Sequence, residues 1–169
     1  MDFGDYRLGE TDQLIALGTA QDNHDLALAM FRQARREILI ASYDLDGMVF
    51  DHEDIIEALS AFARDNRLSH LRILLQTPDR AIKHGHRLVG LAQRLSSSIQ
   101  IHRPAEEHQG FADAFIVVDG IGVLRRKMAE RFEGTGNFKA SIDGRDLHTR
   151  FISMWELSTP ETRLRRLQL

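Results

Sequence analysis

Two aspartates separated by one residue form the sharpest short motif in the sequence. Asp44 and Asp46 stand in the run Asp-Leu-Asp-Gly, directly after an apolar segment. Both carboxylates are therefore expected at the end of a buried strand. Such a pair can supply a nucleophile and a general acid-base group for phosphoryl chemistry. The structural alternative is that the aspartates accept hydrogen bonds from the backbone amides of a turn.

The stretch I-A-S-Y-D-L-D-G-M-V-F-D, residues 40–51, resembles the first motif of haloacid-dehalogenase-type phosphatases. The resemblance implies a magnesium-dependent phosphatase in which Asp44 attacks phosphorus, Asp46 moves the proton and Thr77 holds the phosphate. The sequence departs from that family at Met48, where the family has threonine, and it contains no Gly-Asp-x-x-x-Asp motif. Magnesium needs several oxygen ligands. The structural reading of the two aspartates is therefore favoured, and no metal or cofactor is predicted.

The run His84-Gly85-His86-Arg87 is a second candidate site. Residues two apart do not share a helix face, and the chain has no cysteine to complete a zinc site. A helix start with a histidine and an arginine can instead hold an anion through free amides and a guanidinium. The sequence leaves two readings for His86 and Arg87, a small-anion site or a solvated helix cap.

Basic residues gather around the predicted third strand and the hairpin that follows it. They are Arg103, Arg125, Arg126, Lys127 and Arg131. Glutamates are interleaved with them, so these residues form either an electropositive patch or ordinary surface ion pairs. We retain Arg103 as a candidate ligand for an anion.

The composition indicates a globular protein. The chain has 169 residues, 43% of them hydrophobic, and a formal net charge of −3. This balance gives no general attraction for nucleic acid, and the absence of cysteine excludes disulfides and thiolate chemistry. No apolar run approaches the ~20 residues of a membrane-spanning helix, and the acidic start differs from a secretory signal. We expect a cytoplasmic protein without membrane contact.

Apolar patterning predicts the elements that must position these residues. Short apolar runs predict strands over residues 37–43, 71–76, 99–102, 111–118 and 122–126. Helical spacing predicts helices over residues 11–34 in two pieces, 54–65, 86–95 and 146–157. The glycine-rich stretch 131–143 is predicted to be a loop, and Trp155 is predicted to be buried.

This order of elements predicts an α/β fold, with one mixed parallel/antiparallel sheet and helices on both faces. Residues 1–169 are expected to form a single domain. Residues 1–23 would be an N-terminal helical extension, and residues 159–169 a docked C-terminal arm.

Three segments of the second half carry a family resemblance when they are taken together. They are residues 111–120, the Gly-Thr-Gly-Asn-Phe run at 134–138 and the F-I-S-M-W-E run at 151–156. This pattern resembles the phospholipase D superfamily, in which a strand carries His-x-Lys-x4-Asp-Gly and a Gly-Ser-x-Asn turn closes the phosphate site. The runs E-I-L-I-A-S-Y-D and L-R-I-L-L-Q resemble the opening strands of that fold. The resemblance extends over about residues 24–158.

Matching the motif position by position implies a chain without phospholipase D catalysis. Asp119 matches the motif aspartate and Asn137 the downstream asparagine, but the histidine and lysine positions hold Ala112 and Ala114. None of the eight histidines is followed two residues later by lysine. The resemblance thus implies a catalytically degenerate module that binds or scaffolds, with no catalytic residue. Its ligand-binding residues would converge near the strand ends; they are Asp44, His86, Arg87, Arg103, Asp119 and Asn137.

Further short runs resemble an uncharacterised bacterial branch of the superfamily, whose members stand alone or follow an acetyltransferase domain. These runs are H-G-H-R-L, R-P-A-E-E and the R-R-L-x-L tail. The resemblance implies an acetyltransferase as a partner. Because single-motif members of the superfamily pair two chains across one site, it also implies a homodimer. A small anion and a nucleic-acid segment are the remaining ligand classes.

Overall fold

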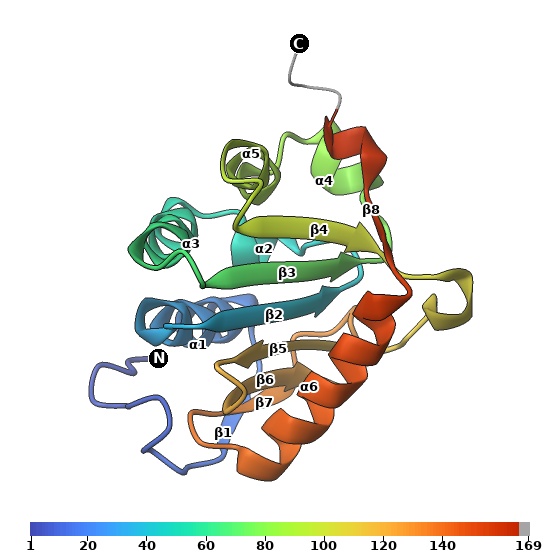
Figure 1. The fold of residues 1–169 in the computed structure, drawn as a ribbon. Helices are drawn as coiled ribbons and strands as arrows, with labels where there is room; N and C mark the ends of the chain where they lie inside the picture. The colour runs from blue at the N-terminus through green and yellow to red at the C-terminus, as the bar shows by residue number, and fades with distance from the viewer. Residues whose placement is uncertain (166–169) are drawn as a thin grey trace.

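A single mixed sheet forms the centre of the computed structural model, which describes residues 1–165 (Figure 1). Its eight strands lie in the order β1-β7-β6-β5-β2-β3-β4-β8. β2, β3 and β4 are parallel, and the other neighbouring pairs are antiparallel. The strands are β1 Ile15–Leu17, β2 Glu37–Ser42, β3 His70–Leu75, β4 Ile99–Arg103, β5 Ala114–Val118, β6 Gly122–Arg126, β7 Gly134–Asn137 and β8 Thr159–Pro160.

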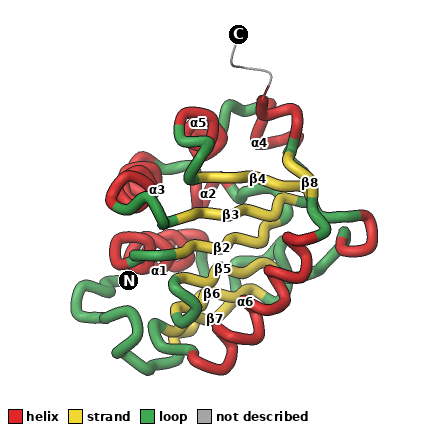
Figure 2. The backbone as a smooth tube through the Cα atoms, in the orientation of Figure 1, coloured by secondary structure: helices red, strands yellow, loops and turns green. Residues whose placement is uncertain are grey.

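Helices cover both faces of this sheet (Figure 2). One face carries α1 Ala20–Gln33, α3 Glu53–Asp65 and α5 Arg87–Arg94, and the other carries α6 Ser141–Glu156. The short helices are α2 Gly47–Phe50 and α4 Asp79–Lys83, with the 3-10 turns η1 Glu106–His108 and η2 Thr162–Arg165. The predicted α/β fold with helices on both faces is confirmed. No helix in residues 1–165 combines the length and the apolar character that crossing a membrane requires.

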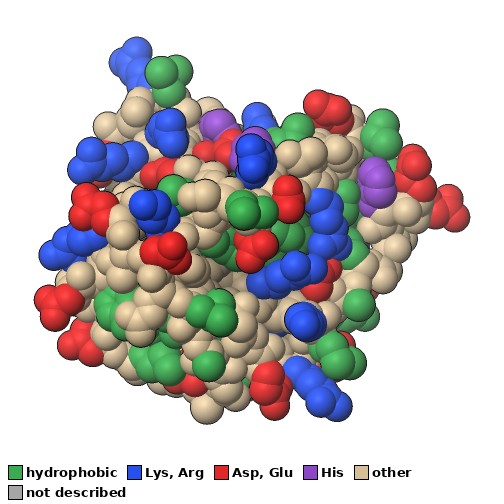
Figure 3. Space-filling model, turned by 90° about the horizontal axis from the view of Figure 1, so that it is seen from below, with side chains coloured by type: hydrophobic (Ala, Val, Ile, Leu, Met, Phe, Trp, Pro, Cys, Tyr) green, Lys and Arg blue, Asp and Glu red, His purple; other side chains and the backbone are tan. Residues whose placement is uncertain are grey.

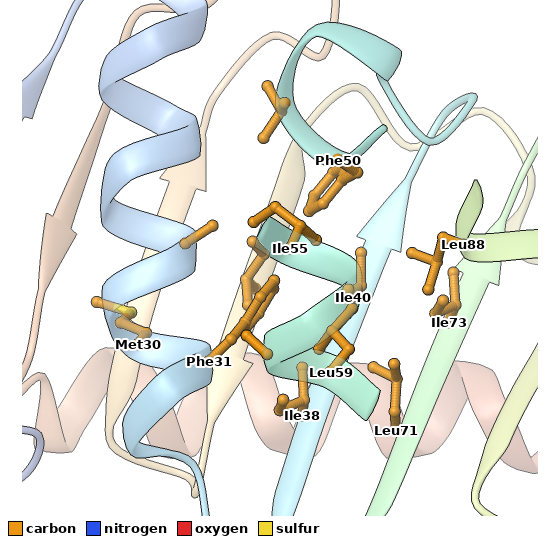
Figure 4. Close-up of a cluster of buried hydrophobic side chains, with 14 of the residues drawn as sticks. Met30, Phe31, Ile38, Ile40, Phe50, Ile55, Leu59, Leu71, Ile73 and Leu88 are labelled. Atoms are coloured by element: carbon orange, nitrogen blue, oxygen red, sulfur yellow. The ribbon is translucent and has the colours of Figure 1, made fainter. Parts of the chain in front are cut away.

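The central strand β2 is buried on both faces because its side chains alternate between two apolar clusters. Ile38 and Ile40 pack under α1 and α3, where Phe31 and Leu59 point toward them (Figure 4). Leu39 and Ala41 belong to the smaller cluster under α6. A strand with two covered faces appears in sequence as a continuous apolar run, which explains why this strand was predictable.

The N-terminal segment differs from the predicted helical extension. α1 begins only at Ala20, because Thr19 and Asp22 form a reciprocal capping box there. Upstream, β1 pairs with β7 and forms the edge of the sheet, so the chain before α1 completes the sheet. The first residues then pack against the core through the Tyr6 ring, which lies 5.3 Å from the Phe138 ring.

Details of the second half of the chain also refine the prediction. The stretch predicted as a loop contains β7, and α6 begins at Ser141 instead of residue 146. Trp155, predicted to be buried, is only half-buried. Its ring stacks on the His102 ring, with 3.8 Å between the ring centroids, and lies beside the Arg72 guanidinium. In the predicted C-terminal arm, β8 pairs with β4, while residues 166–169 lie outside the described part.

His24 makes the stability of the α1–α3 contact dependent on pH. Its Nε2 lies 2.9 Å from the Asp54 carboxylate and its Nδ1 3.0 Å from the Asp25 carboxylate. Burial lowers the pKa of His24, but the hydrogen bonds to Asp54 and Asp25 outweigh that effect, and the net pKa is raised. A raised pKa in the folded state means that the native protein binds the proton more tightly than the unfolded chain.

We expect the free energy of unfolding contributed by His24 to be fully present below the unfolded pKa, about 6.5. It should be lost as the pH rises through the higher folded value. The free energy of unfolding, measured with urea, should therefore decrease between about pH 6 and about pH 8. This decrease should be smaller in His24→Gln than in the wild type. His84→Gln, at an exposed histidine, is the control. An identical decrease in wild type and His24→Gln would contradict the assignment.

Candidate functional site

The carboxyl end of β2 is fixed by a tight turn that carries both aspartates of the Asp-Leu-Asp motif. Leu45 lies between them, buried, with a left-handed φ of 57°. The Ser42 hydroxyl accepts a hydrogen bond of 2.9 Å from the Leu45 amide and so holds this conformation. Asp46 then caps α2, because its Oδ1 accepts a hydrogen bond from the Met48 amide at 3.1 Å. At least part of the motif therefore has the structural role expected for a turn.

Arg126 reaches the same edge from the neighbouring hairpin. The β5–β6 register places Arg126 directly opposite Ala114, and both residues are buried, with 6% and 8% of their surface exposed. The Arg126 Nη1 lies 3.4 Å from the Asp46 Oδ2, and its Nη2 donates a hydrogen bond of 2.7 Å to the Ala129 carbonyl. Its guanidinium also lies 5.5 Å from the Phe132 ring centre. A buried cation thus stands beside Ala114, where the predicted motif alignment expects the phospholipase D lysine.

A second ion pair closes the outer side of this edge. The exposed Arg80 from α4 approaches the Asp44 Oδ2 at 3.3 Å. Burial and the nearby charge of Asp46 raise the pKa of Asp44, while Arg80 and Arg126 oppose that shift. Two carboxylates and two guanidiniums therefore form a charge-balanced set, which we call the edge quartet: Asp44, Asp46, Arg80 and Arg126.

Behind the edge quartet lies a cavity of about 20 Å³, lined by Asn23, Ser42, Ala114, Arg126 and apolar side chains. Its volume suits one water molecule. The Asn23 amide nitrogen donates to the Thr19 and Phe132 carbonyls, each at 2.8 Å. The Asn23 Oδ1 is buried and has no hydrogen-bond partner among residues 1–165. The free space beside Ala114 is therefore small, because the Arg126 side chain fills the volume that a longer side chain at position 114 would occupy.

His86 and Arg87 lie near this edge but are engaged in holding the fold. The His86 Nε2 donates to the Leu45 carbonyl at 2.9 Å, and its Nδ1 accepts from the Leu88 amide at 3.1 Å. These contacts require a neutral imidazole, and burial lowers the pKa of His86 accordingly. The Arg87 Nη1 binds the Asp51 carboxylate at 3.1 Å. His86 joins the start of α5 to the turn before α2, and Arg87 joins it to Asp51 at the end of α2. Their binding of an anion stays a prediction.

Asp119 and Asn137 lie away from the edge quartet. The Asp119 carboxylate accepts hydrogen bonds of 2.8–2.9 Å from the backbone amides of residues 35–37, at the amino end of β2. The six-residue strand separates this end from Asp44 by about 20 Å. The Asn137 Oδ1 accepts hydrogen bonds from the amides of Gln13 and Lys139. Arg103 ends β4, so it lies at the same sheet edge as Asp44. The structure does not bring the predicted residues together into one site.

The remaining basic residues of the hairpin are interspersed with acidic ones. Arg125 lies 3.4 Å from the Asp113 carboxylate, and the face drawn in Figure 3 carries both blue and red side chains. This arrangement favours surface ion pairing over a continuous electropositive patch.

The chemistry that this edge can perform follows from its side chains. Ala112 and Ala114 present methyl groups, which supply neither a nucleophile nor a cation for a phosphate. Within residues 1–165, no group of three or more histidine, aspartate or glutamate side chains is placed to hold a metal ion. The pairing of Asp46 with Arg126 is the main feature that the sequence prediction missed. The hairpin register, which sets Arg126 opposite Ala114, is the signal that could have found it.

Comparisons with known proteins agree with this fold. Nuc from Salmonella typhimurium, a phospholipase D family member, is 17% identical to this chain with a TM-score of 0.58. The match covers 88% of this chain and 95% of Nuc. NucT from Helicobacter pylori is 14% identical with a TM-score of 0.59, covering 88% of this chain and 98% of NucT. TrmBL2, an archaeal chromatin protein, is 15% identical with a TM-score of 0.61, covering 92% of this chain and 57% of TrmBL2.

A comparison with curated protein sequences finds no match. The family described as a domain of unknown function, DUF7931, matches residues 19–167. Because this family model matches most of its length, the chain belongs to the DUF7931 family.

Proposed function

We propose that this protein is a phospholipase D-like domain that does not hydrolyse phosphodiesters and acts as a binding or scaffolding module. The observation that carries the proposal is the position of Arg126, which lies opposite Ala114 and is bound to Asp46 and the Ala129 carbonyl. The place that the motif assigns to a phosphate-binding lysine is taken by a cation already neutralised by the protein itself.

The chemistry of hydrolysis supports the same conclusion. The mechanism implied by the family resemblance needs one imidazole to attack phosphorus and a second to protonate the leaving oxygen. General acid-base catalysis alone contributes about 10²–10⁴-fold to a rate, and a methyl group at position 112 supplies none of it. An arginine cannot replace these groups, because its guanidinium stays protonated in proteins.

The experiment that tests the proposal measures nitrophenolate release from two esters by the purified protein. We expect no release above the buffer rate from bis(p-nitrophenyl) phosphate, the diester. The monoester p-nitrophenyl phosphate with magnesium tests the haloacid-dehalogenase-type alternative, in which Asp44 is the nucleophile. Turnover of the monoester that disappears in Asp44→Asn would overturn the proposal in favour of a phosphatase. Turnover of the diester in proportion to protein concentration would overturn it in favour of a phosphodiesterase.

A binding or scaffolding module needs a partner. We propose a second copy of this chain as the first partner to test, and an acetyltransferase domain as the second. Light scattering of the purified protein should give about twice the mass of one 19.3 kDa chain if two copies pair. TrmBL2, which shares this fold, is described as having a novel mode of DNA binding. A labelled DNA duplex therefore belongs in the same series, where the net charge of −3 predicts weak binding.

A further inference from the structure

Two histidines share one carboxylate at the amino edge of the sheet, opposite the edge quartet. The Glu37 Oε2 lies 2.7 Å from the His70 Nε2, and the Glu37 Oε1 lies 2.8 Å from the His148 Nε2. The three side chains come from β2, β3 and α6 and so fix three elements to one another. We call this arrangement the histidine bridge.

The histidine bridge forms one wall of an open groove of about 620 Å³. The imidazoles of His70 and His148 are 36% and 38% exposed, whereas the Glu37 side chain is only 16% exposed. The carboxylate is therefore covered, and the rings face the groove. The groove is lined in addition by Arg36, Asn66, Leu68, Asp119, Gly120 and Arg145.

The charges around this groove favour a negatively charged ligand. The Asp119 carboxylate is occupied by the amides of residues 35–37, and the Glu37 carboxylate by the two imidazoles. Arg36 and the exposed Arg145 bring two guanidiniums to the same groove. With each Nε2 directed to Glu37, the Nδ1 of each ring is the ring atom left to contact a ligand.

We propose that this groove binds the phosphate group of a small molecule, held by Arg36 and Arg145 and by imidazoles that Glu37 orients. Guanidiniums bind phosphate through charge-assisted, often bidentate hydrogen bonds. The same guanidiniums would repel a divalent cation, so a metal is the less favourable occupant. The inference goes beyond the proposed function, because this groove and the edge quartet lie at opposite ends of β2.

The test is a titration with inorganic phosphate, followed by the imidazole NMR signals of His70 and His148. Saturable shifts of both signals are expected, with chloride at equal ionic strength producing none. In Arg145→Gln the dissociation constant should rise at least about tenfold, since the variant loses a charge-assisted hydrogen bond to the phosphate. Arg94→Gln, at an exposed arginine on α5, is the matched control and should bind as the wild type does.

A second variant separates binding from folding. Glu37→Gln removes the charge that orients the imidazoles, and it should weaken phosphate binding while Arg145 remains in place. Thermal unfolding of each variant shows whether it is folded before it is titrated. Absence of saturable shifts in the wild type, or equal binding by wild type and a folded Arg145→Gln, would overturn the inference. Neither result bears on nitrophenolate release, so failure here and failure of the proposed function are distinguishable.

Discussion

Replacing Ala114 with lysine is expected to destabilise the protein by about 3–5 kcal/mol. Position 114 is buried and lies opposite Arg126, whose charge is already matched by Asp46. The new ammonium group would therefore be a second cation in a space of about 20 Å³. Urea unfolding at neutral pH measures the loss as a lower midpoint at unchanged slope.

Removal of the competing cation provides the matched control. The double variant Ala114→Lys/Arg126→Ala should be more stable than Ala114→Lys, because the lysine can then pair with Asp46. Ala112→His should change the stability by less than about 0.5 kcal/mol, since Ala112 is exposed. If Ala114→Lys is tolerated as well as Ala112→His is, the side chain of Arg126 does not close this edge.

Replacing Arg150 with alanine is expected to cost about 2–3 kcal/mol, the second large effect. Its Nη1 and Nη2 donate to the two oxygens of Asp113 at 2.7 and 2.8 Å, and this fork joins α6 to the start of β5. The Asp113 side chain is only 9% exposed, so the variant leaves a covered carboxylate with Arg125 alone, at 3.4 Å. Breaking a fully buried pair costs about 3–5 kcal/mol; the partial exposure of Arg150 reduces the estimate.

The same pair gives a pH dependence of known sign. Burial raises the pKa of Asp113, but the hydrogen bonds and charge of Arg150 outweigh it and lower the net pKa. Asp113 therefore contributes stability above its unfolded pKa of about 3.9, and this contribution is lost as the pH falls through the lower folded value. In Arg150→Ala, the free energy of unfolding should therefore fall less between neutral and acid pH than in the wild type. Arg145→Ala, at an exposed arginine of the same helix, should unfold as the wild type does; equal behaviour of all three proteins would contradict the assignment.

The strands that were predicted correctly are those buried by apolar side chains, whereas β7 was missed because glycine replaces them. A Cβ on Gly136 would collide with the Leu26 side chain of α1. The glycine that suggested a loop is thus required for close packing between a helix and a strand. β7 also pairs with β1, and this pairing joins residues more than 100 positions apart. Local spacing cannot reveal such a contact.

The candidate site was predictable only in part. Ala114 is the first residue of β5, and Asp119 directly follows its last. The five-residue strand therefore places the two residues at opposite strand ends of the sheet. The hairpin turn likewise fixes Arg126 opposite Ala114. The orphaned Asn23 oxygen and the histidine bridge depend on how α1 and α6 pack on the sheet. No short-range pattern determines that packing.

Quantifying the nitrophenolate released per protein molecule, within the first turnover of bis(p-nitrophenyl) phosphate, tests the central claim most directly. An edge closed by Arg126 and lacking an imidazole nucleophile predicts no burst, and a time course that matches buffer at every protein concentration. A burst approaching one nitrophenolate per chain or per pair of chains would contradict the account, because it would require a nucleophile at this edge.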